Sequence, residues 1–186
     1  MIGIRVCVIT ILLTGLYILF SVGVSSILFN QQSNGSTITE NNKIVGSRLI
    51  GQRFTYSNHF HSRPSANNYR SNFSGNTNYA YKSNGLKTYI KQKSVDFKTI
   101  NNNNIPDLNI LSESASGLDP HITYEGATAQ IKRISSSSKI AENEVKELID
   151  KHAKPRIIGA FGERIVNVVE LNLDLNMLRN KNAKKT

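Results

Sequence analysis

The sequence predicts an α+β protein that consists of one N-terminal transmembrane helix followed by a single mixed α/β extracytoplasmic domain. Three observations predict it: an uncharged apolar run near the N-terminus, later segments with apolar residues at helical spacing, and one segment that alternates apolar and polar residues. A chain of 186 residues suffices for one domain with a modest core. The formal net charge is +10, but the basic residues are scattered and no RNA- or DNA-binding motif occurs, so nucleic acid is not an expected partner.

Residues 6–29, VCVITILLTGLYILFSVGVSSILF, carry no charge. A helix of roughly 24 residues is about 36 Å long, which is enough to cross a bilayer core with some tilt. A cleavable signal peptide is the alternative, because Arg5 precedes the run and Ser25-Ser26 resembles a cleavage site. The apolar stretch continues to Phe29, beyond the usual length in a signal peptide, and this favours a retained anchor.

The charges that flank the apolar run predict its orientation. Arg5 lies on the N-terminal side, whereas residues 30–42 carry only Glu40. By the positive-inside rule, residues 1–5 are cytoplasmic and the large domain is periplasmic or otherwise extracytoplasmic. We therefore expect a single-pass protein of the cell inner (plasma) membrane. The lone cysteine, Cys7, lies inside the run, which excludes an internal disulfide.

One face of the predicted membrane helix carries small and polar residues. At 100° per residue, four hydroxyl side chains fall within about 60° of each other, with a tyrosine beside them. These residues are Thr10, Thr14, Tyr17, Ser21 and Ser25. Helices in lipid associate through such faces, because small residues allow close approach and hydroxyls bond across the contact. The alternative is a chance alignment of common residues; the functional hypothesis is that this face docks on another membrane protein.

Composition divides the rest of the chain. Residues 30–43 are rich in turn formers and read as a polar linker. The extracytoplasmic domain is expected over 44–178, followed by a basic tail over 179–186. Within the domain, asparagine, serine and lysine dominate 70–104, which indicates a loop-rich segment that a partner or the fold itself would order.

Regular structure is expected after Pro106. Apolar residues at helical spacing predict a helix over about 124–137 and another over about 141–152, which ends before Pro155. The stretch VVELNLDLN, residues 168–176, alternates strictly between apolar and polar residues. This pattern predicts a half-buried strand.

The stretch SASGLDPHIT raises the question of catalysis. Its Asp119 and His121 would suit metal ligands, a catalytic pair, or a turn that leads into a helix. The structural interpretation is concrete: Gly117 permits unusual backbone angles, and the sequence Asp-Pro favours a turn. Thr123 then caps the following helix, or Asp119 caps it with Pro120 at the first helical position.

Other chemical sites are not supported. His59 and His61 would bind a metal from one face of a strand if His121 or His152 completed the set, but no carboxylate or cysteine accompanies them at ligand spacing. Neither a G-x-S-x-G elbow nor a G-x-x-x-x-G-K-[ST] phosphate loop occurs. The sequence therefore predicts no catalytic residues, no metal ligands and no cofactor held by a recognisable motif.

Five blocks in the same order carry a resemblance that spans nearly the whole chain. They are LFNQQSNGS (28–36), VGSRLIGQRF (45–54), FHSRPSANNY (60–69), SASGLDPHIT (114–123) and VNVVELNLDLN (166–176). Downstream of a single membrane anchor, they resemble the C subunits of Kdp-type potassium-transporting P-type ATPases. The chain departs from that family at 74–78, where expected prolines are missing, and at 162–167, where G-E-P-R-V-N becomes GERIVN. Both changes affect local loop geometry.

The resemblance marks a set of motif residues as structural or as partner contacts. They are Gly51, Gln52, Arg63, Pro64, Ser65, Gly117, Asp119, Pro120, His121 and Asn167. It implies a non-catalytic subunit of a high-affinity, ATP-driven potassium (K+) importer. Its partners would be a potassium-channel-like subunit, an ATP-hydrolysing pump subunit and a small fourth subunit.

For this family the resemblance implies two roles: stabilising the assembly, and acting as a catalytic chaperone that raises the pump's affinity for ATP in a transient ternary complex. The predicted topology places the domain opposite cytoplasmic ATP, so any effect on ATP affinity would pass through partners as a coupling free energy. The rival interpretation is a free-standing, membrane-anchored extracytoplasmic binding module for cell-envelope material. A secreted enzyme, released by signal cleavage, is a third.

Overall fold

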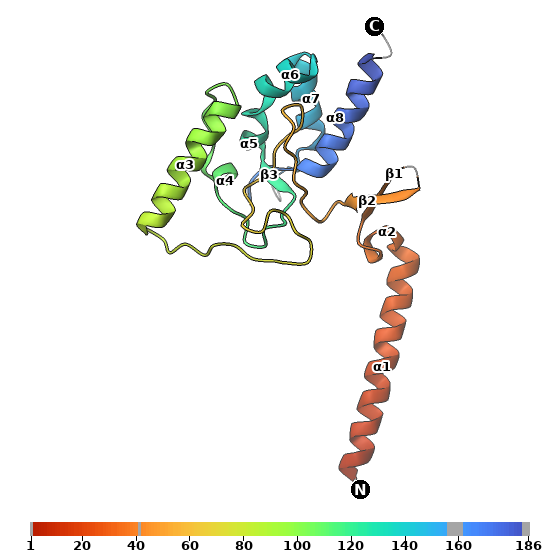
Figure 1. Ribbon diagram of the computed structural model, residues 1–186. Coiled ribbons are helices and arrows are strands. Elements are labelled where there is room, and N and C mark those ends of the chain that lie inside the picture. The colour runs from red at the N-terminus through yellow and green to blue at the C-terminus, as the bar shows by residue number, and fades with distance from the viewer. Residues whose placement is uncertain (1, 41, 156–161, 184–186) are drawn as a thin grey trace. The chain divides into compact units, whose positions relative to one another are not determined.

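The computed structural model describes residues 2–40, 42–155 and 162–183, and it confirms the predicted α+β class. The chain divides into two compact units, Met1–Ser47 and Arg48–Thr186. The first contains α1 (Ile2–Leu28), α2 (Asn30–Ser33), β1 (Thr37–Glu40) and β2 (Lys43–Ser47). The second contains α3 (Asn84–Ile100), α4 (Leu108–Leu111), β3 (His121–Thr123), α5 (Tyr124–Thr128), α6 (Ile131–Ser138), α7 (Glu142–His152), β4 (Ile165–Asn167) and α8 (Val168–Ala183) (Figure 1).

Helix α1 is the predicted membrane helix, and it begins nearer the N-terminus than expected, at Ile2. Its 27 residues have a mean hydropathy of 2.3 in the most apolar window, and none of its side chains is buried within the chain. A helix of this length spans a bilayer.

The segment predicted as a polar linker, 30–43, has regular structure instead. A short α2 is followed by an antiparallel hairpin of β1 and β2, in which Thr37 faces Ser47. The hydroxyl of Ser47 donates a hydrogen bond of 2.7 Å to the carbonyl oxygen of Gly35 and so closes the base of the hairpin. Asn42 has a φ of +61°, a left-handed angle that asparagine tolerates, and this allows the tight turn.

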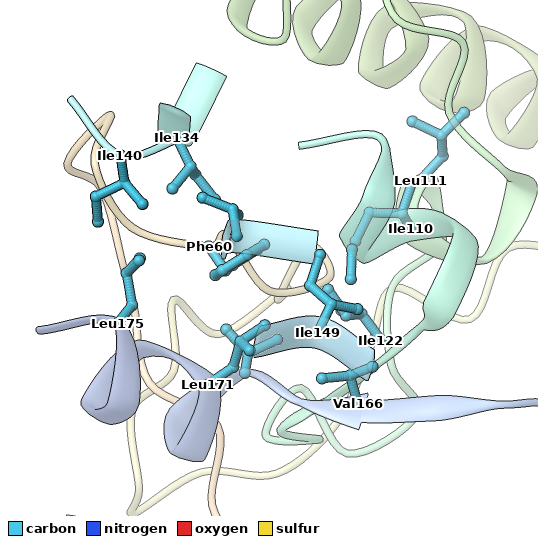
Figure 2. Close-up of a cluster of buried hydrophobic side chains, with 13 residues drawn as sticks. Phe60, Ile110, Leu111, Ile122, Ile134, Ile140, Ile149, Val166, Leu171 and Leu175 are labelled. Atoms are coloured by element: carbon cyan, nitrogen blue, oxygen red, sulfur yellow. The ribbon is translucent and has the colours of Figure 1, made fainter. Parts of the chain in front are cut away.

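The second unit is built around one hydrophobic cluster (Figure 2). Side chains with no more than 1% exposure come from four helices, both strands of a small sheet and the segment before α3. The largest of them are Phe60, Ile122, Ile134, Ile149, Leu171 and Leu175. Phe60 lies in an irregular segment, so its buried side chain attaches the chain between β2 and α3 to the core without strand pairing.

The helices after β3 follow the predicted positions with one interruption. The helix expected over 124–137 is divided into α5 and α6 by a turn at Ala129-Gln130. The helix expected over 141–152 is confirmed as α7, with Val145 and Ile149 fully buried.

The strand predicted over 168–176 is wrong: these residues form the first half of α8. Its fully buried side chains include Val168, Leu171, Asn172 and Leu175, which are spaced as i, i+3, i+4 and i+7 along one helical face. The strict alternation of VVELNLDLN fits a strand. Leu171 and Leu175 also fit one face of a helix, provided that Asn172 is buried on that face with them. The strand that exists, β4, ends immediately before it.

The loop-rich segment predicted over 70–104 is also only partly correct, because α3 occupies its second half. Ser83 caps α3 by accepting a hydrogen bond of 3.1 Å from the backbone N–H of Leu86. Ile90 and Phe97 pack against the core cluster, yet no residue of α3 is fully buried. Helix α3 therefore lies on the surface of the unit, held by a few apolar contacts.

A two-stranded antiparallel sheet joins the SASGLDPHIT stretch to the C-terminal part of the chain. In it His121 faces Asn167 and Thr123 faces Ile165. The backbone N–H of Val168 also donates to the carbonyl oxygen of Pro120, at 2.8 Å. The start of α8 is thus fixed beside the turn that precedes β3.

Candidate functional site

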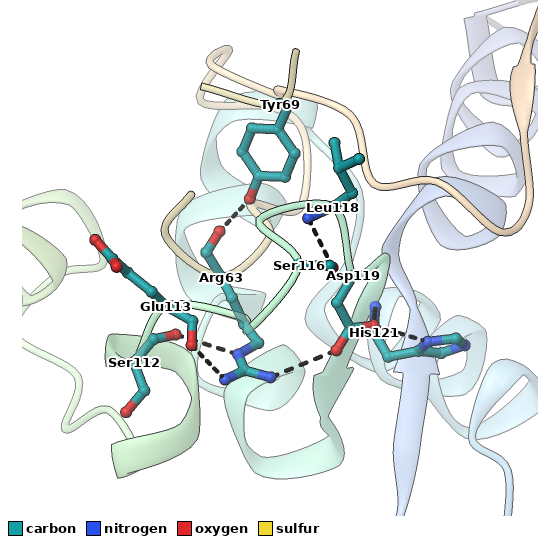
Figure 3. Close-up of polar contacts among 8 residues, drawn as sticks. All are labelled: Arg63, Tyr69, Ser112, Glu113, Ser116, Leu118, Asp119 and His121. Carbon is teal, nitrogen blue, oxygen red and sulfur yellow. Dashed lines mark hydrogen bonds and ion pairs between the residues drawn. The ribbon is translucent and has the colours of Figure 1, made fainter. Parts of the chain in front are cut away.

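All of the motif residues lie in the second unit, and several of them meet around the turn before β3. We call the group Arg63, Ser65, Gly117, Asp119 and His121 the Arg63 junction. Figure 3 shows Arg63, Asp119 and His121 of this group. The junction joins the FHSRPSANNY and SASGLDPHIT blocks, which are far apart in the sequence, and its contacts explain why each residue type is needed.

Arg63 holds the chain that leaves α4. Its Nε donates to the carbonyl oxygen of Ser112 at 3.2 Å, and its Nη2 donates to the carbonyl oxygen of Glu113 at 3.0 Å. Its Nη1 lies 3.4 Å from Oδ2 of Asp119 (Figure 3). The planar guanidinium supplies donors in several directions at once, which a lysine ammonium on a flexible stem does not.

Gly117 is required by both its backbone angle and its surroundings. Its φ is +71°, and a Cβ at this position would lie 2.9 Å from Oδ1 of Asn67 and 2.9 Å from the carbonyl oxygen of Gly75. The hydroxyl of Ser65 donates to the carbonyl oxygen of Gly117 at 2.7 Å. The predicted role of Gly117 as a turn residue is confirmed.

Asp119 and His121 form a pair within the turn. Oδ1 of Asp119 accepts a hydrogen bond of 3.0 Å from the backbone N–H of His121 and lies 3.1 Å from Nδ1 of its ring. The hydrogen bond from His121 lowers the pKa of Asp119, and the charge of Arg63 acts in the same direction. The carboxylate is thus engaged by two neighbours in the same junction.

Thr123 caps the N-terminus of α5, which confirms the first of the two predicted registers. Its hydroxyl oxygen accepts from the backbone N–H of Gly126 at 3.0 Å and donates to Oδ2 of Asp107 at 2.7 Å. Asp119 instead bonds within its own turn, so the register with Asp119 as cap is wrong.

The remaining motif residues flank the junction. Gly51 donates its backbone N–H to the carbonyl oxygen of Leu118 at 2.6 Å, and a Cβ there would lie 2.9 Å from the carbonyl oxygen of Asp119. Gln52 is half-buried beside it. Pro64 lines a pocket of about 280 Å³.

Asn167 begins α8. Its Oδ1 accepts from the backbone N–H groups of Val169 at 3.0 Å and Glu170 at 3.2 Å, which is the geometry of a helix cap. Its Nδ2 donates to the carbonyl oxygen of Arg48 at 2.7 Å. This asparagine therefore links the start of α8 to the beginning of the second unit.

Two buried side-chain amides, which the sequence motifs did not indicate, hold the FHSRPSANNY block in place. Oδ1 of Asn172 accepts from the backbone N–H of Phe60 at 2.7 Å, and its Nδ2 donates to the carbonyl oxygen of Phe60 at 2.9 Å. Gln130 does the same for His61, at 2.8 Å and 3.1 Å. Each side-chain amide thus bonds both the backbone N–H and the carbonyl oxygen of one residue, as a neighbouring strand would. For Asn172 the only sequence signal was a polar residue on an otherwise apolar helical face, whereas Gln130 lies in the turn between α5 and α6.

A buried arginine was also missed. Arg133 is 5% exposed, and its Nε donates to Oδ1 of Asn101 at 2.8 Å. Its Nη2 donates to Oε1 of Gln130 at 2.7 Å, and its Nη1 to the carbonyl oxygen of His59 at 2.8 Å. Burial lowers the pKa of Arg133 to about 10. The positive charge is dispersed over neutral oxygens.

The four histidines do not converge. His59 and His61 lie beside Arg133, and burial is the main cause that lowers the pKa of both, that of His61 to about 4. His121 bonds Asp119, and Nε2 of His152 lies 3.0 Å from Oδ2 of Asp174. Among the described residues, no group of three or more histidine, cysteine, aspartate or glutamate side chains is placed to hold a metal ion.

Three hydroxyls of the stripe on α1 bond to the backbone of their own helix. Thr10 donates to the carbonyl oxygen of Val6 at 2.9 Å, and Ser21 donates to that of Tyr17 at 2.8 Å. Ser25 donates to the carbonyl oxygen of Val22 at 3.1 Å. Thr14 lies on the same face, one turn beyond Thr10.

Comparison with known proteins connects this arrangement to one family. The model of the family "K+-transporting ATPase, c chain" matches residues 1–177. A potassium-transporting ATPase KdpC subunit of Koribacter versatilis (strain Ellin345) is 38% identical over 169 residues, which cover 90% of this chain and 88% of that protein.

Two further relatives carry the same description. The KdpC subunit of Gloeobacter violaceus is 37% identical over 164 residues, covering 88% of this chain and 87% of its own length. That of Caldanaerobacter subterraneus subsp. tengcongensis is 40% identical over 169 residues, covering 89% and 87%. With an apolar anchor helix, the Arg63 junction and a family match over nearly all its length, the chain belongs to the family of C subunits of K+-transporting ATPases.

Proposed function

We propose that the chain stabilises the assembly of a high-affinity, ATP-driven potassium importer in the inner (plasma) membrane. Its partners in this proposal are a potassium-channel-like subunit, an ATP-hydrolysing pump subunit and a small fourth subunit. The family match over residues 1–177 carries the proposal, because it includes both the anchor helix and the whole Arg63 junction.

Helix α1 supplies the contact with membrane partners in this proposal. Thr10, Ser21 and Ser25 bond to carbonyl oxygens of their own helix, so these three hydroxyls enter lipid with their hydrogen bonds satisfied. The same small side chains leave room for a second helix to approach closely. The stripe therefore suits an interface inside the bilayer.

The orientation follows from the flanking charges: the N-terminus is cytoplasmic and the second unit is extracytoplasmic. A Cys7→Ser variant with Asn180→Cys tests it, because Asn180 is exposed on α8. A membrane-impermeant thiol reagent, given access to the outer face of intact cells or spheroplasts, is expected to label this variant. If the variant is labelled only after the membrane is opened, the second unit lies on the cytoplasmic side and the proposed orientation is contradicted.

The proposed chaperone effect on ATP then acts through partners. With the second unit on the outer side, a higher ATP affinity of the pump subunit requires a coupling free energy transmitted across the complex. A photoreactive ATP analogue applied to the assembled complex is expected to label the pump subunit alone. Labelling of this chain would show direct contact with the nucleotide and contradict the indirect route.

Affinity capture separates this function from a free-standing binding module. The tagged chain, extracted in mild detergent, is expected to bring down two larger membrane proteins and a small one. Capture of the chain alone would favour the binding module, whose ligand would be cell-envelope material. Intact mass of the captured chain tests the secreted enzyme as well, since signal cleavage would remove the α1 segment.

A further inference from the structure

An apolar groove with a cationic rim runs along α3, outside the Arg63 junction. It has a volume of about 700 Å³. Its apolar lining includes Leu86, Ile90 and Val95 of α3 together with Leu111 of α4. Val95 is 53% exposed, and no residue of α3 is fully buried. This helix thus presents apolar surface that its own unit does not cover.

The rim of the groove is strongly basic. Lys82, Lys87, Lys91 and Lys98 line it, and none of its described lining residues is an aspartate or a glutamate. Three of these lysines are spaced i, i+4 and i+11, so they fall within about 40° on one side of the helix. The single acidic residue of α3, Asp96, is about 140–180° away from them and accepts a hydrogen bond from Gln92 at 2.8 Å.

Such a lysine stripe is unfavourable in isolation. Like charges four residues apart on a helix repel each other and destabilise it. An anionic surface laid along the stripe would convert that repulsion into attraction, and the neighbouring apolar side chains would enter a nonpolar layer. A helix with lysines on one side and apolar residues beside them is typical of segments that lie in a membrane interface.

We propose that the α3 groove docks on a bilayer surface that contains anionic phospholipid, with the four lysines against headgroups and the apolar lining at the acyl boundary. Two observations favour a bilayer over other anionic partners. The rim has complementary charge, and residues 29–47 connect the second unit to the membrane helix, so a lipid surface is always at a high effective concentration. The inference holds for either orientation of the chain.

The test uses the full chain in lipid nanodiscs. A Cys7→Ser, Val95→Cys variant carries an environment-sensitive fluorophore in the groove, and a Cys7→Ser, Glu147→Cys variant carries it on the exposed surface of α7. Discs are made of phosphatidylcholine alone or of an equal mixture with phosphatidylglycerol. In the mixture, the groove label is expected to shift its emission to shorter wavelength and to be quenched by spin-labelled acyl chains. The α7 label is expected to change little.

Two triple variants, each of which removes three lysine charges, test whether the α3 groove is responsible for docking. Lys87→Gln/Lys91→Gln/Lys98→Gln removes the stripe, and Lys132→Gln/Lys139→Gln/Lys154→Gln removes three lysines elsewhere in the same unit. Each lysine near an anionic surface contributes roughly fivefold to binding, so the first variant should reduce the ratio of docked to free label ~100-fold. The second should reduce it by no more than ~3-fold. Salt at ~1 M, where the Debye length is about 3 Å, should release the docked state.

Three results would overturn the proposal. The groove label responding equally in both kinds of disc would show that anionic lipid is not recognised. Equal losses in the two triple variants would show a general charge effect rather than a site. A groove label shielded from aqueous quencher in the complete complex in phosphatidylcholine discs would show that a protein partner occupies the groove. Circular dichroism of both triple variants, expected to show unchanged helix content, separates loss of docking from loss of fold.

Discussion

Arg63 and Asp119, 56 positions apart in the sequence, are joined by an ion pair with 3.4 Å between Nη1 and Oδ2. The same guanidinium bonds two backbone carbonyl oxygens, of Ser112 and Glu113. One side chain therefore fixes the exit from α4 and the turn before β3 at once. His121 completes the arrangement by bonding the other oxygen of Asp119.

Replacing Arg63 by alanine is expected to destabilise the second unit by about 2–3 kcal/mol, because two partly buried carbonyl oxygens and one carboxylate lose a charged donor. Arg63→Lys should recover less than half of this loss, since an ammonium does not reproduce the planar set of donors. Urea unfolding of the full chain in detergent, followed by circular dichroism, measures both.

Arg70→Ala is the control for these variants, because Arg70 is exposed. It should change stability by less than ~0.5 kcal/mol. Equal effects of the Arg63 and Arg70 substitutions would show that the Arg63 junction contributes no more than a surface charge.

Gly117→Ala is expected to destabilise the chain by about 3 kcal/mol. Part of this comes from the left-handed backbone angle, and part from the contacts of a Cβ with Asn67 and the Gly75 carbonyl oxygen at 2.9 Å. Gly35→Ala separates the two parts, because Gly35 has a similar φ of +76° but open space around its Cβ position. It should lose only about 1 kcal/mol. Thermal unfolding that gives the same loss for both would contradict the close approach at Gly117.

Stability should fall with acidification between pH 6.5 and about 4 because of His61. Burial, helped by the charge of Arg133, lowers the pKa of His61 from 6.5 to about 4 in the folded chain. In this window the unfolded chain binds a proton that the folded chain does not, so stability is full above pH 6.5 and declines as pH falls. One pKa unit is about 1.4 kcal/mol, so the decline amounts to ~3 kcal/mol.

Urea unfolding across this pH range in the original chain and in His61→Gln measures the effect. In the variant, the free energy of unfolding should depend only weakly on pH, and part of the remaining dependence comes from His59, whose pKa is also lowered. Asp119 affects stability at lower pH. Because its pKa is depressed below the usual 3.8, its contribution to folding stability is present above pH 3.8 and is lost as the pH falls further. Parallel curves for the two proteins between pH 6.5 and 4 would show that His61 is not the group responsible.

The sequence was sufficient wherever a local pattern decides the structure. The apolar run and the period of α7 are local features, and the structure has both. For the helix cap, the sequence left Thr123 and Asp119 as alternatives, and the structure selects Thr123. At Gly117 the turn was foreseeable from residue type, but its close contact with Asn67 was not, because that contact joins segments far apart in the chain.

The error at α8 has a physical reason. VVELNLDLN satisfies a period of two, and it satisfies a helical period only if Asn172 is buried. Burial of an amide is favourable when its hydrogen bonds are satisfied, and here the backbone of Phe60 supplies both. A partner 112 positions away cannot be seen in the local pattern. The signal that was available is the helix-start pattern of Asn167 followed three residues later by Glu170.

At α3, too, tertiary contacts decide the structure. The many asparagines, serines and lysines in 70–104 predicted a loop-rich segment that a partner or the fold itself would order. In the structure, Ile90 and Phe97 of α3 lie at helical spacing, and the surrounding domain supplies the surface against which they pack. Tertiary packing, which composition does not report, decides this segment.

We propose that the hydroxyl stripe of α1 holds the chain in the potassium-transporting complex. Thr10→Leu/Thr14→Leu/Ser21→Leu fills that face with bulk, whereas Val8→Leu/Gly23→Leu adds bulk on the opposite side of the same helix. The direct measurement is the amount of the two larger subunits captured per tagged chain in mild detergent. The stripe variant is predicted to lose about tenfold and the opposite-face variant to retain its partners. Unchanged capture by the stripe variant would contradict the claim.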